Sequence, residues 1–288
     1  MKRTIAIVFL FAAAAAFASR PAKKPVAPKS ADALLAGAAK VWSQDFESFA
    51  VGSCPYASKC GTNDCLGVSD WRSLSGRKAL LVEPNLGSAQ PNEWKWSLGD
   101  FGGKVPKTLR GHLVVQFAYF CDSPLSTATA SDFSIDFAGE RYSSVGIALG
   151  GESNLKCAPK TKSGGVTPKD KSDKLRSVGF GLPTQRAYRW YRYTVKIPVG
   201  RTIDGNVSAA MEELGNDGSW MFLSGGCLSN PDMYTQAAKT DLTLSVLASR
   251  SWGSSYRAFV DDIEVYVVQE AGKTDVGASE DDIISLDE

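Results

Sequence analysis

Apolar and polar residues alternate along much of the chain, which is the pattern of β-strands whose successive side chains point to opposite faces. The alternation is clearest in six segments, which cover residues 112–121, 133–137, 145–149, 193–197, 242–246 and 263–267. In the first of these, Leu113, Val115 and Phe117 share one face. The opposite faces are also partly apolar, which favours two sheets packed face to face over a single solvated sheet.

Glycine and serine pairs separate these segments, at positions where strands are expected to turn. They are Ser75-Gly76, Gly102-Gly103, Gly150-Gly151, Gly164-Gly165 and Gly225-Gly226. No long segment has apolar residues at the 3.6-residue period of a helix. We expect at most one or two helical turns, near residues 31–40 or 208–214. The pattern therefore predicts an all-β protein.

The two ends of the chain differ in composition from the β-patterned middle. Lys2 and Arg3 precede an apolar stretch that ends in Ala16-Phe17-Ala18, the arrangement of a secretory signal peptide. We assign residues 1–18 to this signal, 19–40 to a flexible leader, 41–269 to one β-sandwich domain and 270–288 to an acidic flexible tail. No later apolar stretch has the length of a transmembrane segment. We expect a secreted protein, extracellular or periplasmic.

The formal net charge of the chain is +1, which argues against a dedicated nucleic-acid-binding protein. The charge is unevenly spread, because residues 154–176 are rich in lysine and arginine while the last residues of the chain are acidic. We interpret the basic segment as a solvated loop. The alternatives are contact with an acidic polysaccharide or an anionic envelope, and pairing with the acidic tail of the same chain.

The cysteine content fits an oxidising compartment. The chain has six cysteines, an even number, at positions Cys54, Cys60, Cys65, Cys121, Cys157 and Cys227. There is no Cys-x-x-Cys pair and His112 is the single histidine, so a zinc site is a poor alternative. We expect disulfides, and their pairing stays open. Asn206-Val207-Ser208 is a glycosylation sequon if the host glycosylates it.

Acidic residues lie next to apolar strands near both ends of the predicted domain. Asp45-Phe46-Glu47 precedes the first turn, and Asp261-Asp262 is embedded in the last strand. This placement predicts that the first and last strands lie side by side. Oxygen ligands for a hard cation would then meet there.

An ordered set of motifs resembles the secreted jelly-roll carbohydrate-binding modules and the concanavalin-like or laminin-G-like lectin domains. The motifs are Phe46-Glu47, Trp71, Ser75-Gly76-Arg77-Lys78-Ala79-Leu80, Trp190 with Tyr193 and Val195, and Asp261-Asp262-Ile263. The segment between Cys54 and Cys65 and the basic segment are insertions relative to that pattern. The resemblance implies an antiparallel two-sheet jelly-roll sandwich and a carbohydrate or glycan as partner.

The same resemblance implies a structural calcium ion (Ca2+). Its side-chain ligands would be Glu47 and one of Asp261 and Asp262, because adjacent residues of a strand point to opposite faces unless a bulge intervenes. The alternative is that these acids cap strands or pair with Arg77 or Arg257.

Flat aromatic rings are the expected sugar-binding groups, since the C–H face of a pyranose stacks on them. Our candidates for ligand binding are Trp94, Trp96, Trp252, Tyr256 and Trp220. Trp94 and Trp96 are two residues apart and would share one face of a strand. The alternative for any one of these side chains is core packing, and Trp190 in particular is expected to be structural.

Catalysis is the main competing class of function, because glycoside hydrolases and polysaccharide lyases also use this sandwich. The nearest acidic pair is Asp136 and Glu140, which departs from the Glu-x-Asp-x-x-Glu pattern of the sandwich hydrolases. His112 lacks the Gln-x-His context of the alginate-lyase-like sandwiches. We therefore name no catalytic residue and expect a non-catalytic, lectin-like binding module. A structural or adhesive cell-surface protein with a protein partner is the second hypothesis.

Overall fold

The computed structural model describes most of two β-sheets. The described residues are 26–53, 66–82, 92–97, 109, 111–122, 129–138, 144–150, 153–158, 178–199, 206–229, 241–248 and 257–269. In the second sheet the description is limited almost entirely to the backbone. The predicted signal peptide and acidic tail lie outside the described residues.

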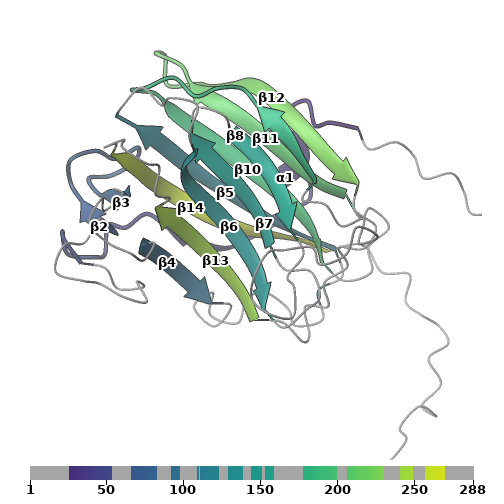
Figure 1. Ribbon diagram of the computed structural model, residues 1–288, viewed down its shortest axis with the longest axis horizontal. Helices are drawn as coiled ribbons and strands as arrows, with labels where there is room; N and C mark the ends of the chain where they lie inside the picture. The colour runs from purple at the N-terminus through teal and green to yellow at the C-terminus, as the bar shows by residue number, and fades with distance from the viewer. Residues whose placement is uncertain are drawn as a thin grey trace, which may run out of the picture.

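The strands form two antiparallel sheets that overlap in Figure 1. The eight-stranded sheet has the order β12 (Trp220–Ser229), β11 (Asn206–Leu214), β10 (Trp190–Val199), β5 (Gly111–Cys121), β14 (Ala258–Gln269), β3 (Ala79–Val82) and β2 (Leu66–Ser69), and β1 (Ala39–Gln44) also pairs with β14. The six-stranded sheet has the order β4 (Asn92–Ser97), β13 (Asp241–Ala248), β6 (Thr129–Ala138), β7 (Ser144–Gly150), β8 (Ser153–Ala158) and β9 (Val178–Leu182). The predicted all-β, antiparallel two-sheet class is confirmed.

The helical content is one short helix, α1 (Asp32–Leu35), among the described residues. It falls inside one of the two segments where helical turns were expected. The other expectation, for residues 208–214, is wrong, because these residues belong to β11. Alanine, methionine and glutamate at 209–213 are good helix formers, but β11 pairs with β10 on one side and with β12 on the other. Sheet pairing outweighs the weak local preference.

Strand β14 joins the two ends of the domain. Along one edge it pairs with β5. Along the other edge its first residues pair with β3, and residues 263–267 pair with β1. A bulge between Asp261 and Glu264 marks the change of partner, and Asp262 has φ +47° there. The predicted contact between the first and last strands of the domain is therefore present.

One face of the eight-stranded sheet is apolar throughout its centre, and we call it the inner face. Leu113, Val115, Phe117 and Tyr119 of β5 lie on it and have no exposed surface. Phe117 stacks on Tyr193 with ring centroids 5.4 Å apart. Full burial of an apolar side chain of this size stabilises a fold by about 1.5–3 kcal/mol.

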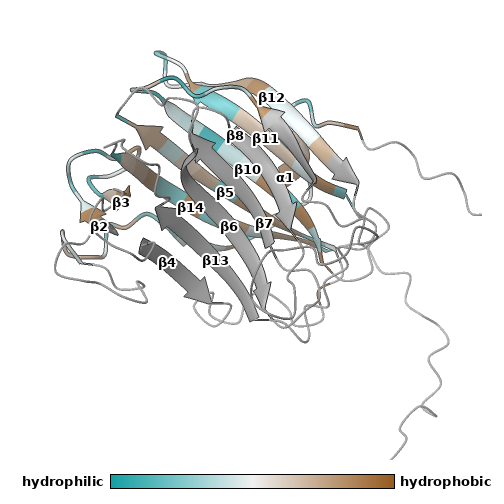
Figure 2. Ribbon diagram, viewed as in Figure 1, coloured by the Kyte–Doolittle hydropathy of each residue, from teal (hydrophilic) through white to brown (hydrophobic). Residues whose placement is uncertain are grey.

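The opposite, outer face of this sheet combines apolar and charged positions, since the register places Arg192 and Glu212 on the same face as Ala118 and Phe120. Along their length β10 and β11 carry both hydrophobic and hydrophilic residues (Figure 2). A cluster of Ala79, Ala118, Phe120, Trp190 and Phe259 is buried on this face. Trp190 is 9% exposed, in line with its expected structural role.

Two segments pack on the outer face. Residues 26–36 do so although they were assigned to the leader: Ala31 and Leu34 contact Ala210 of β11, and the position of a Cβ on Gly225 would be 2.5 Å from the Pro28 carbonyl oxygen. The turn between β2 and β3, residues 70–78, is the second segment. There the Arg72 guanidinium lies 4.4 Å from the centre of the Phe120 ring.

Two cysteines have described side chains, and they do not pair with each other. Cys121 lies in β5 and Cys227 in β12, with β10 and β11 between them. Three strand spacings amount to about 14 Å, which exceeds the Cα separation of about 7 Å that a disulfide can bridge. Ser208 donates a hydrogen bond to Cys227 Sγ at 3.2 Å. The disulfide prediction otherwise depends on side chains outside the described ones.

Within the described part of the chain, no helix has the length and apolar character of a membrane span.

Candidate functional site

The strand register gathers several loops at one end of the eight-stranded sheet. Cys121, at the end of β5, pairs with Ala258 at the start of β14, and Phe120 pairs with Trp190 at the start of β10. Leu214, at the end of β11, pairs with Trp220 at the start of β12. We call this the loop end, and define it by Trp71, Asp122, Arg186, Tyr188, Arg189, Asn216 and Arg257.

Trp71 is a supported and exposed ring at the loop end. The residue is 62% exposed, and the Arg257 guanidinium lies 5.3 Å from its ring centre, within reach of a cation–π interaction. Arg257 is held in turn by Asp122, with 2.9 Å between Nε and Oδ2 and a second 2.9 Å hydrogen bond from the Arg257 backbone N–H. The ring is therefore placed by contacts that reach down to strand β5.

Tyr188 is the second exposed ring at the loop end. It is 64% exposed, and its backbone N–H donates to the carbonyl oxygen of Cys121 at 2.8 Å. Its φ of +61° is unusual for an aromatic residue and costs on the order of 1–3 kcal/mol. Because Cys121 precedes Asp122, Tyr188 and Trp71 are both anchored at the end of β5.

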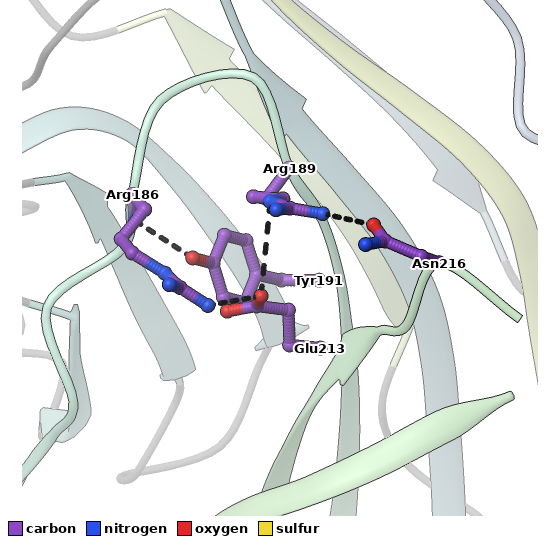
Figure 3. Close-up of polar contacts among 5 residues, drawn as sticks. All are labelled: Arg186, Arg189, Tyr191, Glu213 and Asn216. Carbon is purple, nitrogen blue, oxygen red and sulfur yellow. Dashed lines mark hydrogen bonds and ion pairs between the residues drawn. The ribbon is translucent and has the colours of Figure 1, made fainter.

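Two arginines share one buried carboxylate beside Tyr188, and we call them the arginine pair (Figure 3). The Glu213 side chain is 3% exposed, and its Oε1 forms an ion pair with Nη2 of Arg186 and lies 3.9 Å from Nε of Arg189. Arg189 Nη1 donates to Asn216 Oδ1 at 2.9 Å.

The backbone of Arg186 is fixed as well, since its N–H donates to the Tyr191 hydroxyl at 2.7 Å. Contacts with the Tyr191 hydroxyl and with Glu213 raise the pKa of Arg186, and burial raises the pKa of Tyr191. Both groups therefore keep their protons at neutral pH.

A second polar area lies on the outer face, around Arg192. The Arg192 guanidinium is 2.5 Å from a Glu212 oxygen and 4.7 Å from the centre of the Trp220 ring. Trp220, one of the predicted ligand-binding residues, is half-buried and packs against the cluster that contains Trp190. Much of the Trp220 ring is therefore covered by other side chains of the protein.

Tyr266 and Glu264 extend this outer-face area to β1. The Tyr266 hydroxyl donates to Glu264, and Glu264 pairs with Lys40 at 2.8 Å. Burial, followed by the contact with Glu264, raises the pKa of Tyr266, so this hydroxyl holds its proton and is a poor base.

The three predicted metal ligands are brought to one segment, residues 74–78. Asp261 Oδ2 accepts hydrogen bonds from the backbone N–H groups of Leu74 at 2.8 Å and Ser75 at 3.2 Å, and Asp262 accepts one from the Ser75 hydroxyl at 2.6 Å. Glu47 Oε1 accepts from the backbone N–H groups of Arg77 at 2.7 Å and Lys78 at 2.6 Å. The bulge in β14 lets both aspartates reach Ser75.

In the structure these carboxylate oxygens accept hydrogen bonds from N–H and O–H groups of residues 74–78, which they would share with or give up to a bound ion. No group of three histidine, cysteine, aspartate or glutamate side chains that could hold a metal occurs within the described residues. The expected pairing of these acids with Arg77 is seen only through the Arg77 backbone. Calcium stays a prediction.

Protonation of the three acids differs with their surroundings. Backbone hydrogen bonds from Arg77 and Lys78 lower the pKa of Glu47. Burial, and then the charge of Asp262, raise the pKa of Asp261 to about 7. Burial also raises the pKa of Asp262.

The other predicted sugar-binding residues remain predictions. Trp94 and Trp96 lie in β4 opposite Val246 and Leu244, and the register places them on the same face, as expected from their spacing. Their side chains are not among those described. Trp252 and Tyr256 lie outside the described residues.

Sequence reasoning missed most of the loop end. Trp71 was noted only as a family motif. Like Trp252, which was chosen as a candidate, it lies next to a segment rich in serine and glycine. Residues 185–189 place Arg186, Tyr188 and Arg189 between two strands, and a polar loop with aromatic and arginine residues is a signal for binding.

The residues weighed for catalysis are not assembled into a site by the described structure. His112 is 4% exposed and pairs with Pro198 and Val268. Asp136 lies in β6 opposite Thr243 and Ser144, and Glu140 is outside the described residues.

Comparisons with known proteins find similarity in structure and not in sequence. No protein-family model matches the chain, and no curated protein matches its sequence. A marine PL-14 alginate lyase from Aplysia kurodai is similar in structure, with a TM-score of 0.50 and 11% identity over 80% of this chain and 99% of that chain.

Two further solved structures have lower scores. A carbohydrate esterase from the Shiga toxin-encoding bacteriophage phi24B has a TM-score of 0.47 and 14% identity, and covers 80% of this chain and 99% of its own. Peanut lectin has a TM-score of 0.40 and 12% identity, and covers 81% of this chain and 100% of its own. The similar folds thus include carbohydrate-active enzymes and a lectin. At these identities the likeness concerns the fold alone.

Proposed function

We propose that the protein is an exported, non-catalytic module that binds a carbohydrate through the loop end. One observation carries this proposal: Trp71 and Tyr188 are exposed by 62% and 64%, and both are anchored at the end of β5. Exposed rings of this size that are also fixed in place are suited to stacking against the apolar face of a pyranose.

Hydrogen-bonding groups accompany the two rings. Asp122 and Arg257 lie beneath Trp71, and Arg189 and Asn216 lie in the loops next to Tyr188. Side chains of this kind satisfy sugar hydroxyls while the rings take the C–H face. Trp190, by contrast, is 9% exposed and belongs to the apolar cluster under the loop, so we give it no part in binding.

Binding is tested by measuring the affinity of the full chain for soluble glycans on an array and for insoluble polysaccharides in pull-down assays. Trp71→Ala and Tyr188→Asn should each weaken binding about five- to thirtyfold, since loss of one stacked ring costs on the order of 1–2 kcal/mol. Asparagine is chosen for Tyr188 because it tolerates positive φ.

Val51→Ala is the matched control, because Val51 is an exposed apolar side chain outside the loop end, 53% exposed. It should bind as the unaltered protein does. Unchanged affinity in both Trp71→Ala and Tyr188→Asn would contradict the proposal. Association only with a protein partner would support the adhesive alternative.

The structural calcium ion is proposed separately. Its support is the family resemblance and the convergence of Glu47, Asp261 and Asp262 on residues 74–78. Thermal unfolding with calcium chloride and then with a chelator tests it. A higher Tm with calcium that disappears in Glu47→Gln supports the ion, whereas equal Tm values contradict it.

A further inference from the structure

We infer that the arginine pair is a subsite for an acidic group, so that the glycan bound at the loop end is anionic. This inference rests on the proposed function and adds the chemical class of the ligand. Its starting point is an imbalance of charge: Arg186 and Arg189 share a single carboxylate, that of Glu213.

The positive charge of the pair is directed to solvent. The Glu213 side chain is 3% exposed, while those of Arg186 and Arg189 are 68% and 39% exposed. A carboxylate buried beneath two guanidinium groups neutralises one of them and leaves a net charge of about +1 at the surface. An approaching anion therefore meets the cations and not Glu213.

The pair is also held in position before any ligand binds. Arg186 is fixed through Glu213 and, by its backbone, through Tyr191, whereas Arg189 is fixed by Asn216. An arginine has five N–H donors, and these contacts use only a few of them. The remaining donors suit a carboxylate or sulfate, which guanidinium groups bind through paired hydrogen bonds.

Nearby acids do not cancel this charge. Asp217, in the same turn as Asn216, accepts hydrogen bonds from the Ser219 backbone N–H at 3.0 Å and hydroxyl at 2.7 Å. Asp122 pairs with Arg257. Among the described residues, Glu213 is thus the carboxylate that contacts the pair.

Tyr188 lies between Arg186 and Arg189 in the sequence, so its exposed ring belongs to the same loop as the two charges. A sugar ring stacked on Tyr188 would present its ring substituents to the guanidinium groups. A uronic acid carries a carboxylate at such a position, and a sulfated sugar carries a sulfate. Both satisfy the same site.

The test compares matched acidic and neutral probes. Oligogalacturonate and its methyl ester differ only in the carboxylate, and a sulfated galactan and its desulfated form differ only in the sulfate. The unaltered protein should bind at least one acidic probe about tenfold more tightly than its neutral counterpart, and the preferred pair identifies the acidic group. The preference should decrease as sodium chloride is raised.

Arg189→Gln is the main variant. Arg189 lies 3.9 Å from Glu213, and its replacement leaves Arg186 as the ion-pair partner of this carboxylate. It should weaken binding of the acidic probe about tenfold and leave the neutral probe unchanged. Arg77→Gln, an exposed arginine outside the loop end, is the control and should change neither. Circular dichroism and Tm establish that the variants fold.

The outcomes separate this inference from the proposed function. Equal binding of acidic and neutral probes, or an equal loss of both in Arg189→Gln, overturns the acidic subsite while carbohydrate binding stands. Binding of the neutral probes as tight as that of the acidic ones, and dependent on Trp71 and Tyr188, also overturns the subsite alone. Absence of binding to every probe and to the glycan array overturns both.

Discussion

Glu213 and Asp261 are buried carboxylates of the same sheet that meet different kinds of donor. Glu213 faces the side chains of Arg186 and Arg189, which reach the surface. Asp261, with no exposed surface, faces the backbone N–H groups of Leu74 and Ser75. The first carboxylate positions charged groups that can contact a ligand, whereas the second attaches a turn to the sheet.

The comparison shows that burial of an acid does not identify a site. What matters is whether its partners keep donors that face solvent. The arginines next to Glu213 do, and the backbone amides next to Asp261 do not. A change at Asp261 should therefore affect folding, and a change near Glu213 should affect binding.

The largest expected effect is that of Asp261→Ala on stability. The substitution leaves the Leu74 and Ser75 N–H groups without their acceptor, and at pH 5 it should lower the free energy of unfolding by about 3 kcal/mol. Denaturant unfolding measures this. Asp262→Gly is the control: it keeps the positive φ of the bulge, removes one contact with Ser75, and should change stability by less than about 1 kcal/mol. Equal losses would contradict the assigned roles.

The pH dependence of stability should follow from the same residue. The folded-state pKa of Asp261 is about 7, above the ordinary value of about 3.9 in the unfolded chain. The folded protein thus binds the proton more tightly, and this contribution to stability is lost as the pH rises from about 4 to about 7.

Between pH 5 and pH 7 the loss should be about 2 kcal/mol. Asp261→Asn does not titrate and should lack this part of the pH dependence when both proteins are unfolded in denaturant at the two pH values. A parallel pH dependence in the two proteins would contradict the raised pKa.

A smaller effect should come from Gly76→Ala. Gly76 has φ +57°, and an added Cβ would lie 2.5 Å from Glu47 Oε1. Strain and displacement of Glu47 should together lower stability by about 1.5 kcal/mol. Gly52→Ala has a similar φ, +79°, with no atom within 4 Å of the new Cβ, and isolates the strain. If the two variants unfold at the same denaturant concentration, the Glu47 contact adds no stability.

The smallest effect should be that of Glu213→Gln on stability, about 0.5 kcal/mol, because its arginine partners are well exposed and solvent screens the ion pair. Denaturant unfolding at low and high salt measures it, and the difference from the unaltered protein should diminish with salt. A loss as large as that of Asp261→Ala would assign Glu213 to the scaffold and weaken the distinction between the two carboxylates.

Sequence patterns were informative for the sheets. The six alternating segments all lie in strands, because burial of one face dictates a two-residue period. The acids near the two ends of the domain indicated that its first and last strands are neighbours, and β1 and β14 do pair. The bulge at Asp262 was considered but not predictable, since it depends on the change from β3 to β1 along β14.

The loop end was largely beyond sequence reasoning. Trp71 and Trp190 are the same residue type, but Trp190 is 9% exposed in the apolar cluster against which Leu74 packs, whereas Trp71 is 62% exposed beside Arg257. The role that we assign to Arg186 and Arg189 depends on their contacts with Glu213, which lies in β11. Contacts between segments that are distant in the sequence determine these roles, so the local alternation of apolar and polar residues does not reveal them.

The position of β14 has a consequence for synthesis. This strand is the last of the described strands in the sequence, yet it separates β5 from both β3 and β1. The larger sheet cannot be completed until residue 269 has left the ribosome. Until then β5, β3 and β1 lack the strand with which they pair. Such late pairing between distant segments slows folding. A chain shortened by about thirty residues at its C-terminal end would lose β14, which is a central strand of the sheet and not an edge strand.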